Sequence, residues 1–101
     1  MALRDSTIER IDPTTIPLGA AGDVLITLAF SGPILSQIRP SDISVKLDEL
    51  DLGLQDFDRK TNTIQVNVPP KEPVAGKKQY QIKVYVKKDQ MILPNKTLTY
   101  P

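Results

Sequence analysis

The chain of 101 residues contains neither cysteine nor histidine, which excludes disulfides, thiolate chemistry and the commonest general base and transition-metal ligand. Its 13 basic and 12 acidic side chains leave a formal net charge of +1, so the overall charge does not indicate a nucleic acid or a membrane as partner. The length predicts a single domain over residues 1–101, and nine prolines with few aromatic residues favour a β domain rich in turns.

The first half of the chain predicts four strands around one irregular segment. Thr7–Ile11 precedes two prolines and a glycine, which predict a bent edge strand. Asp23–Phe30 carries apolar residues at every second position, as a strand buried on one face does. We interpret Ile34–Asp42 as a loop with at most one helical turn, because a proline stops any helix early. Ile43–Leu47 and Leu50–Leu54 alternate similarly and predict a hairpin with an acidic tip and leucines facing the core.

The second half of the chain predicts three more strands. Asp56–Asn62 is charged and predicts a turn, with Phe57 as its apolar anchor. Thr63–Pro69 alternates and ends in two prolines, after which a proline-containing loop leads to the next strand. Met91–Tyr100 forms the last strand, and Pro94 within it predicts a bend or an edge position, because proline cannot donate a ladder hydrogen bond.

The clearest strand is Gln79–Lys88, which has a strict period of two. Its inward row is predicted to be Tyr80, Ile82, Val84 and Val86. Its outward row is predicted to be Gln81, Lys83, Tyr85 and Lys87. A tight turn at Lys88-Asp89-Gln90 is expected to follow. An apolar row of this kind needs a second layer of sheet to cover it.

Seven short strands with turns about every ten residues predict an all-β, antiparallel two-layer sandwich. A small five- or six-stranded barrel shares the same pattern and is the structural alternative. Neither interpretation names a function, because both architectures carry many unrelated ones.

The order of the motifs along almost the whole chain resembles the IPT/TIG immunoglobulin-like domain. The residues that carry the resemblance are Ile8-Glu9-Arg10-Ile11-Asp12-Pro13, Pro17-Leu18-Gly19, Val24-Leu25-Ile26-Thr27-Leu28, Val66-Asn67-Val68-Pro69-Pro70, Gly76, Tyr80–Val86 and Leu98-Thr99-Tyr100. Two departures are Gly19-Ala20-Ala21-Gly22-Asp23 in place of a run richer in glycine, and Val45-Lys46-Leu47 where the family often has Phe-Gly. The resemblance implies an immunoglobulin-like β-sandwich of about seven strands.

The resemblance also implies a non-enzymatic structural or protein–protein interaction module, expected to be part of a larger multidomain or multi-subunit bacterial protein. One alternative is a carbohydrate-binding module that uses the face with Lys83, Tyr85 and Lys87. Another is the accessory or dimerisation domain of a DNA-binding transcription factor. Protein is the expected partner, carbohydrate is the second choice, and nucleic acid is disfavoured because no arginine forks accompany the lysines.

The candidate partner-binding face is the outward row Gln81, Lys83, Tyr85 and Lys87. Tyr85 is the aromatic residue placed outward, and an aromatic between lysines suits a protein or a sugar surface. Further lysines near it in sequence form a basic cluster with Lys83 and Lys87, namely Lys71, Lys77, Lys78 and Lys88. Solubility and protection of a sheet edge are the structural explanation for the same lysines.

The acidic turn from Asp48 to Asp51, with Asp56 and Asp58 beyond it, is the candidate for a hard cation such as calcium. The spacing does not match an EF-hand loop, and a solvated hairpin tip is the preferred interpretation. No catalytic residue, resident metal or cofactor is predicted. The segment Met1-Ala2-Leu3-Arg4-Asp5 lacks the apolar core of a signal peptide, and no run reaches membrane-spanning length, so we expect no membrane insertion. Localisation is left open, with a fragment of a bacterial surface or secreted protein as one setting.

Overall fold

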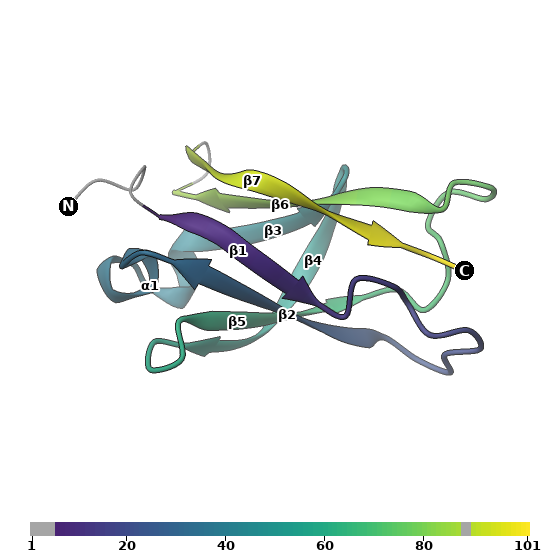
Figure 1. Ribbon diagram of the computed structural model, residues 1–101, viewed down its shortest axis with the longest axis horizontal. Coiled ribbons are helices and arrows are strands. Elements are labelled where there is room, and N and C mark those ends of the chain that lie inside the picture. Colours follow the sequence, from purple (N-terminus) through teal and green to yellow (C-terminus); the bar gives the residue numbers. More distant parts are fainter. Residues whose placement is uncertain (1–5, 88–89) are drawn as a thin grey trace.

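The computed structural model describes residues 6–87 and 90–101, which form an elongated all-β structure of 41 × 23 × 21 Å (Figure 1). Its strands are β1 (Thr7–Asp12), β2 (Val24–Ser31), β3 (Ile43–Leu47), β4 (Leu50–Asp58), β5 (Thr63–Val68), β6 (Gln79–Val86) and β7 (Gln90–Thr99). The four-residue helix α1 (Ile34–Gln37) and the 3₁₀ helix η2 (Pro40–Asp42) connect β2 to β3. The predicted all-β fold with seven strands is therefore confirmed. The segment after β2 contains two short helices rather than the one helical turn at most that was predicted.

The seven strands hydrogen-bond in the order β1-β2-β5-β4-β3-β6-β7, and each neighbouring pair is antiparallel. Strand β4 joins the two halves of this sheet. Its first residues, Leu50–Leu52, pair with β3, whereas Gly53–Asp58 pair with β5, with a register shift between Leu54 and Asp56. A bulge of this kind bends a strand and lets it pass from one layer to the next.

Strands β1 and β7, which are the first and last in the hydrogen-bonding order, lie side by side, so the sheet almost closes on itself (Figure 1). Beyond β1, Thr15 forms a parallel bridge with Thr99 at the end of β7. The N–H of Ile16 donates to the Thr99 carbonyl at 2.9 Å, and the N–H of Thr99 donates to the Thr14 carbonyl at 2.9 Å. The single sheet is nearly barrel-shaped, and the predicted two-layer sandwich is not confirmed. The sheet has seven strands rather than the five or six of the barrel alternative.

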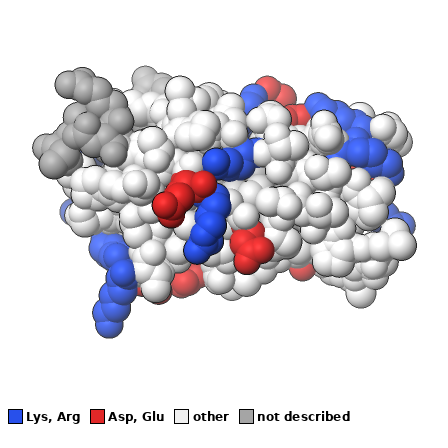
Figure 2. Space-filling view, viewed as in Figure 1, with Lys and Arg blue, Asp and Glu red and all other residues white. Residues whose placement is uncertain are grey.

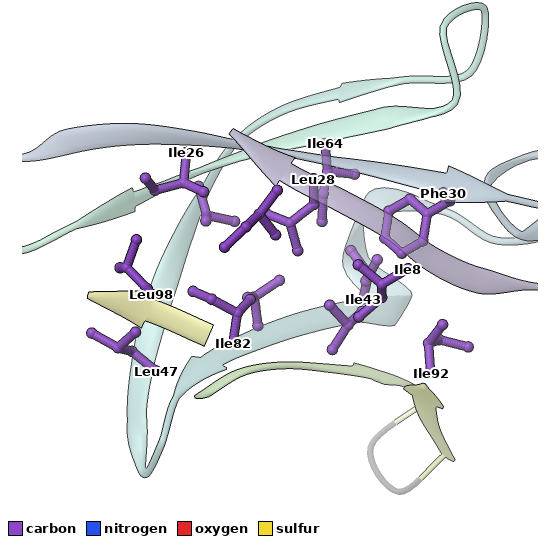
Figure 3. Packing of buried hydrophobic residues seen from close by; sticks show 14 of the residues in the cluster. Ile8, Ile26, Leu28, Phe30, Ile43, Leu47, Ile64, Ile82, Ile92 and Leu98 are labelled. Carbon is purple, nitrogen blue, oxygen red and sulfur yellow. The ribbon is translucent and has the colours of Figure 1, made fainter. Parts of the chain in front are cut away.

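One hydrophobic core fills the inside of the curved sheet. Figure 3 shows side chains from β1, β2 and β5 pointing toward those from β3, β6 and β7. The alternation predicted for β5 and β6 is confirmed, because the inward residues of both strands are almost completely buried. These residues are Ile64, Val66, Val68, Tyr80, Ile82, Val84 and Val86. At about 25 cal/mol per Å² of apolar surface removed from water, such rows dominate the stabilisation of the fold.

Two predictions for the middle of the chain are wrong. Asp56–Asn62 is not a turn throughout, because β4 continues to Asp58 in order to complete its ladder with β5. Leu50 is not committed to the core and is 41% exposed, since it lies directly after the turn of the hairpin. Leu52, further along the strand, does pack partly buried against the core. Phe57 packs there too, as its predicted anchor role requires.

The β6–β7 hairpin matches the sequence prediction in most respects. Pro94 lies in β7, which is the last strand in the hydrogen-bonding order. The pairing of β6 with β7 shifts register between Ile82 and Val84, where β7 contains extra residues. Strand β6 ends at Val86 rather than at the predicted Lys88. Lys87 follows it in the left-handed region, with φ of 53°, and therefore does not continue the outward row as a strand residue. Lys88 and Asp89 of the predicted turn lie outside the described residues.

Candidate functional site

The predicted partner-binding face lies on the outer surface of β3, β6 and β7, which is called the outer face below. Tyr85 on β6 is opposite Ser44 on β3, and Lys83 is opposite Lys46. Gln81, Lys83 and Tyr85 are each half-buried, because neighbouring strands flank β6 on both sides. The structure thus places these three residues together in one row and puts the exposed Lys87 at the end of that row.

The lysines of the outer face form ion pairs with acidic residues of the β3–β4 hairpin. Lys83 lies 4.0 Å from Glu49, and Lys46 lies 3.3 Å from Asp51. The acidic side chains project furthest, with 93% of Glu49 exposed against 24% of Lys83. Positive charge on this part of the face is therefore largely compensated, and the predicted cationic stripe is weaker than the sequence alone indicates.

The remaining described lysines of the predicted basic cluster are also distributed rather than pooled. Lys77 pairs with Asp48, and Lys78 pairs with Glu72. In the view of Figure 2, basic and acidic side chains stand beside one another at the centre, and several basic side chains gather at the upper right next to acidic ones. The described residues on this face form no continuous groove of positive charge of the kind that follows a nucleic-acid backbone.

The carboxylates of the acidic turn from Asp48 to Asp51 form ion pairs and a hydrogen bond with other residues of the protein. Asp48 adopts a φ of 53° at the hairpin tip, and one of its oxygens accepts a hydrogen bond of 2.8 Å from the N–H of Gln81. The hydrogen bond from Lys77 lowers the pKa of Asp48, and the bond from Gln81 lowers it further. Since the neighbouring Glu49 and Asp51 face lysines as well, the geometry corresponds to the solvated, salt-bridged hairpin tip rather than to a cation cage. Within residues 6–87 and 90–101, no three acidic side chains converge as metal ligands.

An exposed apolar cluster adjoins Tyr85, and the sequence analysis missed it. Met91 on β7 is the direct cross-strand partner of Tyr85 and is 38% exposed. Leu93, two residues further along β7 in the segment opposite Lys83, is 58% exposed. Their alternation with the buried Ile92 could have placed both outward, but Pro94 suggested an irregular strand in which facing could not be assigned. A half-buried aromatic side chain beside two exposed apolar side chains is a composition typical of protein contact surfaces.

A shallow hollow lies at the end of β6 where Lys87 leaves the strand. It is lined by Lys87 and by Ser41, Asp42, Ile43 and Ser44. The N–H of Lys87 donates to the Asp42 carbonyl at 2.7 Å, which fixes the backbone there. The Asp42 carboxylate accepts a hydrogen bond of 2.9 Å from the N–H of Arg39. The hollow thus carries charges of both signs, and its chemistry selects no single class of small ligand.

Two buried tyrosines organise the loop between β5 and β6. Tyr80 and Tyr100 pack edge to face, with ring centroids 5.4 Å apart. The Tyr100 hydroxyl donates to the Pro69 carbonyl at 2.8 Å, and burial raises the pKa of Tyr100 to about 12. Both rings therefore serve structure, as predicted from their inward positions, and Tyr85 is the tyrosine that contributes to the outer face.

The chain matches no family model, and no curated protein matches it. The helices in the described part of the chain are only four and three residues long, so none of them could cross a membrane. The site must therefore be interpreted from its own residues: a row of ion pairs, an aromatic side chain and an adjoining apolar cluster.

Proposed function

We propose that the chain is an immunoglobulin-like module of the IPT/TIG kind that acts by contact with other proteins and has no catalytic activity. The outer face is the contact surface in this proposal. The observation that carries it is the pair Tyr85 and Met91, which stand opposite each other on β6 and β7 with the exposed Leu93 beside them. Aromatic, methionine and leucine side chains in one exposed cluster supply the apolar centre that a protein interface needs.

The strand order supports the immunoglobulin-like part of the proposal. In immunoglobulin constant-type domains, strands A, B, E and D form one sheet, and C, F and G form the other. Lettered in chain order, β1-β2-β5-β4 and β3-β6-β7 reproduce those two sets. The difference is that β4 also pairs with β3, so the two sets are joined along one side.

Tyr80 supplies a second, independent support. Immunoglobulin-like domains often carry a tyrosine near the start of strand F whose hydroxyl bonds back to backbone a few residues upstream. Tyr80 is the second residue of β6, and its hydroxyl bonds to the backbone of Val74. The same residue also contributes to the sequence resemblance with the IPT/TIG domain.

The contact role can be tested by photo-crosslinking in the cells that make the protein. A benzophenone amino acid is placed at Tyr85 in one variant and at Leu25 in a matched control. Leu25 is a suitable control because it is 41% exposed, while the adjacent Ile26 points into the core. We expect the Tyr85 variant to crosslink to one identifiable protein and the Leu25 variant to give no such product. Equal labelling from both positions, or none from Tyr85, contradicts the contact role of the outer face.

A carbohydrate-binding role is the competing hypothesis for the same surface, because Tyr85 could stack on a sugar ring. A glycan array separates the two hypotheses. Binding of the unmodified domain that disappears in Tyr85→Ala favours the carbohydrate role, whereas an absence of glycan binding together with a specific protein crosslink favours the protein contact.

A further inference from the structure

Two loops lie at the same end of the long axis, the end at which β7 finishes (Figure 1). They are called the loop end below, and they comprise residues 13–23 between β1 and β2 and residues 69–78 between β5 and β6. Each loop carries an exposed aliphatic side chain, because Leu18 is 87% exposed and Val74 is 55% exposed. Their exposed neighbours are small or apolar as well, namely Pro17, Ala21, Pro73 and Ala75. The charged residues of both loops lie at their bases, so both tips are uncharged.

Buried residues fix the backbone of both loops close to these exposed side chains. Ile16, two residues before Leu18, is 1% exposed, and its N–H donates to the Thr99 carbonyl at 2.9 Å. In the other loop, the hydroxyl of the buried Tyr80 accepts from the N–H of Val74 and donates to its carbonyl. The fold therefore holds two aliphatic side chains outside its own core at the same end of the molecule.

Charged residues surround the loop end only at its base. They are Lys71, Glu72, Lys77 and Lys78 of one loop, and Asp12 and Asp23 on either side of the other. Lys77 pairs with Asp48, and Lys78 pairs with Glu72. Because both signs are present, the apolar tips rather than a net charge define the chemistry of the loop end.

We propose that the loop end docks on the surface of a lipid bilayer, with Leu18 and Val74 entering the boundary between headgroups and acyl chains. The size of the loop end favours a bilayer over a protein. The whole chain trace measures only 23 × 21 Å across its long axis. Two tips within this section offer less than the roughly 800 Å² that each partner of a standard protein interface buries. A bilayer needs no such area, because its lipids close around separate apolar tips.

Two further properties of the loop end suit a bilayer. The tips carry no charge, so their entry places no ion in hydrocarbon. The lysines at the base have long aliphatic stems and can reach lipid phosphates while the tips are inserted. Such docking is peripheral and needs no membrane-spanning segment. It uses a different surface from the outer face, so it does not rest on the contact role proposed above.

The chain contains no tryptophan, so a single introduced tryptophan reports its own surroundings. In Leu18→Trp and Val74→Trp, the fluorescence emission should shift to shorter wavelength when vesicles of phosphatidylcholine and phosphatidylserine are added. Leu93→Trp is the matched control, because Leu93 is 58% exposed but lies six residues before Thr99 along β7, away from the loop end. Its emission should not change. Unchanged emission from residues 18 and 74, or an equal shift from residue 93, overturns the proposal.

Vesicle sedimentation tests the chain without an added aromatic residue. The unmodified chain should bind weakly and reversibly, with half of it bound at about 1 mM lipid. Leu18→Asp and Val74→Asp should each raise that concentration at least about fivefold, since each places a charge where lipid must replace water. Leu93→Asp should bind as the unmodified chain does, and urea unfolding checks that each variant is folded.

Two results of the sedimentation experiment overturn the bilayer as the partner. One is equal binding by the unmodified chain and all three aspartate variants, because binding would then come from another surface. The other is no binding by the unmodified chain at about 10 mM lipid. If a benzophenone amino acid at Leu18 then crosslinks to one protein in the cells that make the chain, the loop end is a protein contact instead.

Discussion

The Tyr80 hydroxyl closes a pair of hydrogen bonds on the backbone of Val74, accepting from its N–H at 2.9 Å and donating to its carbonyl at 3.2 Å. The Val74 side chain is 55% exposed, whereas the Tyr80 ring is buried. A core residue therefore holds the backbone of the loop between β5 and β6, while the side chain of Val74 faces solvent. Val74 is therefore held through its backbone rather than through its side chain.

Removing this hydroxyl should be measurable as a loss of stability. Tyr80→Phe leaves the buried ring in place and removes the hydrogen-bond partner of the Val74 N–H, while the Val74 carbonyl keeps its bond from the N–H of Lys77. The substitution should cost about 1–2 kcal/mol of unfolding free energy. Tyr85→Phe is the matched control and should change stability by less than about 0.5 kcal/mol, since the Tyr85 hydroxyl forms no hydrogen bond with the residues that the structure describes. Urea unfolding measures both. An equal loss in the two variants contradicts the structural role of Tyr80.

The assignment of faces on β6 predicts opposite outcomes for adjacent residues. Val84 is completely buried, so Val84→Asp places a charge without a partner in the core and costs several kcal/mol, enough to unfold the domain. Lys83→Asp only exchanges a partly exposed charge near Glu49 and should cost less than about 1 kcal/mol. Circular dichroism and urea unfolding decide the matter; comparable damage from the two substitutions would show that the faces are assigned the wrong way round.

Stability should depend on pH through Asp48. Its pKa is lowered from the ordinary 3.8 in the folded state, first by Lys77 and then by the N–H of Gln81. A lowered folded-state pKa contributes stability that is complete above pH 3.8 and is lost as the pH falls toward the folded-state value. The urea concentration at the unfolding midpoint should therefore decrease as the pH is lowered below about 4. In Asp48→Asn this decrease should be smaller. If Asp48→Asn shows the same acid dependence as the unmodified protein, the Lys77 interaction contributes little.

Left-handed backbone at two positions predicts contrasting effects of glycine. Lys87 has a φ of 53°, and Lys87→Gly should relieve strain and stabilise the domain by up to about 1 kcal/mol. Asn62 has a φ of 60°, but its amide donates to the carbonyls of Phe30 and Gly32 at 2.8 and 2.9 Å. Asn62→Gly should therefore destabilise by about 1–2 kcal/mol. Thermal unfolding compares the pair, and the same sign of change at both positions would contradict this account.

Most of the strands could be predicted from the sequence, because apolar and polar residues alternate along a strand that is buried on one face only. Ile64, Val66 and Val68 on β5 are an unambiguous example. The extent of β4 was not predictable in this way. Its charged residues Asp56 and Asp58 resemble a turn, and only the pairing with β5 makes them part of a strand.

The candidate site was predicted in part for a similar reason. Residues on one strand, such as Lys83 and Tyr85, share a face by local geometry, and the structure places them together. The pairing of Lys83 with Glu49 and of Tyr85 with Met91 depends on strand register, which local sequence does not determine. Because of these non-local pairings, the outer face is an apolar cluster bordered by ion pairs, whereas the sequence predicted a cationic stripe.

Strand β4 has a consequence for how the molecule opens. Because β4 hydrogen-bonds to β5 on one side and to β3 on the other, the backbone ladder runs without a break from β1 to β7. The sheet therefore cannot separate along β4 without losing backbone pairing. Strands β1 and β7 lie next to each other without pairing as a ladder, and the backbone bonds of Thr99 reach only Thr14 and Ile16, beyond the end of β1. Transient opening should begin there, so amide hydrogens of β1 and β7 should exchange with solvent before those of β5.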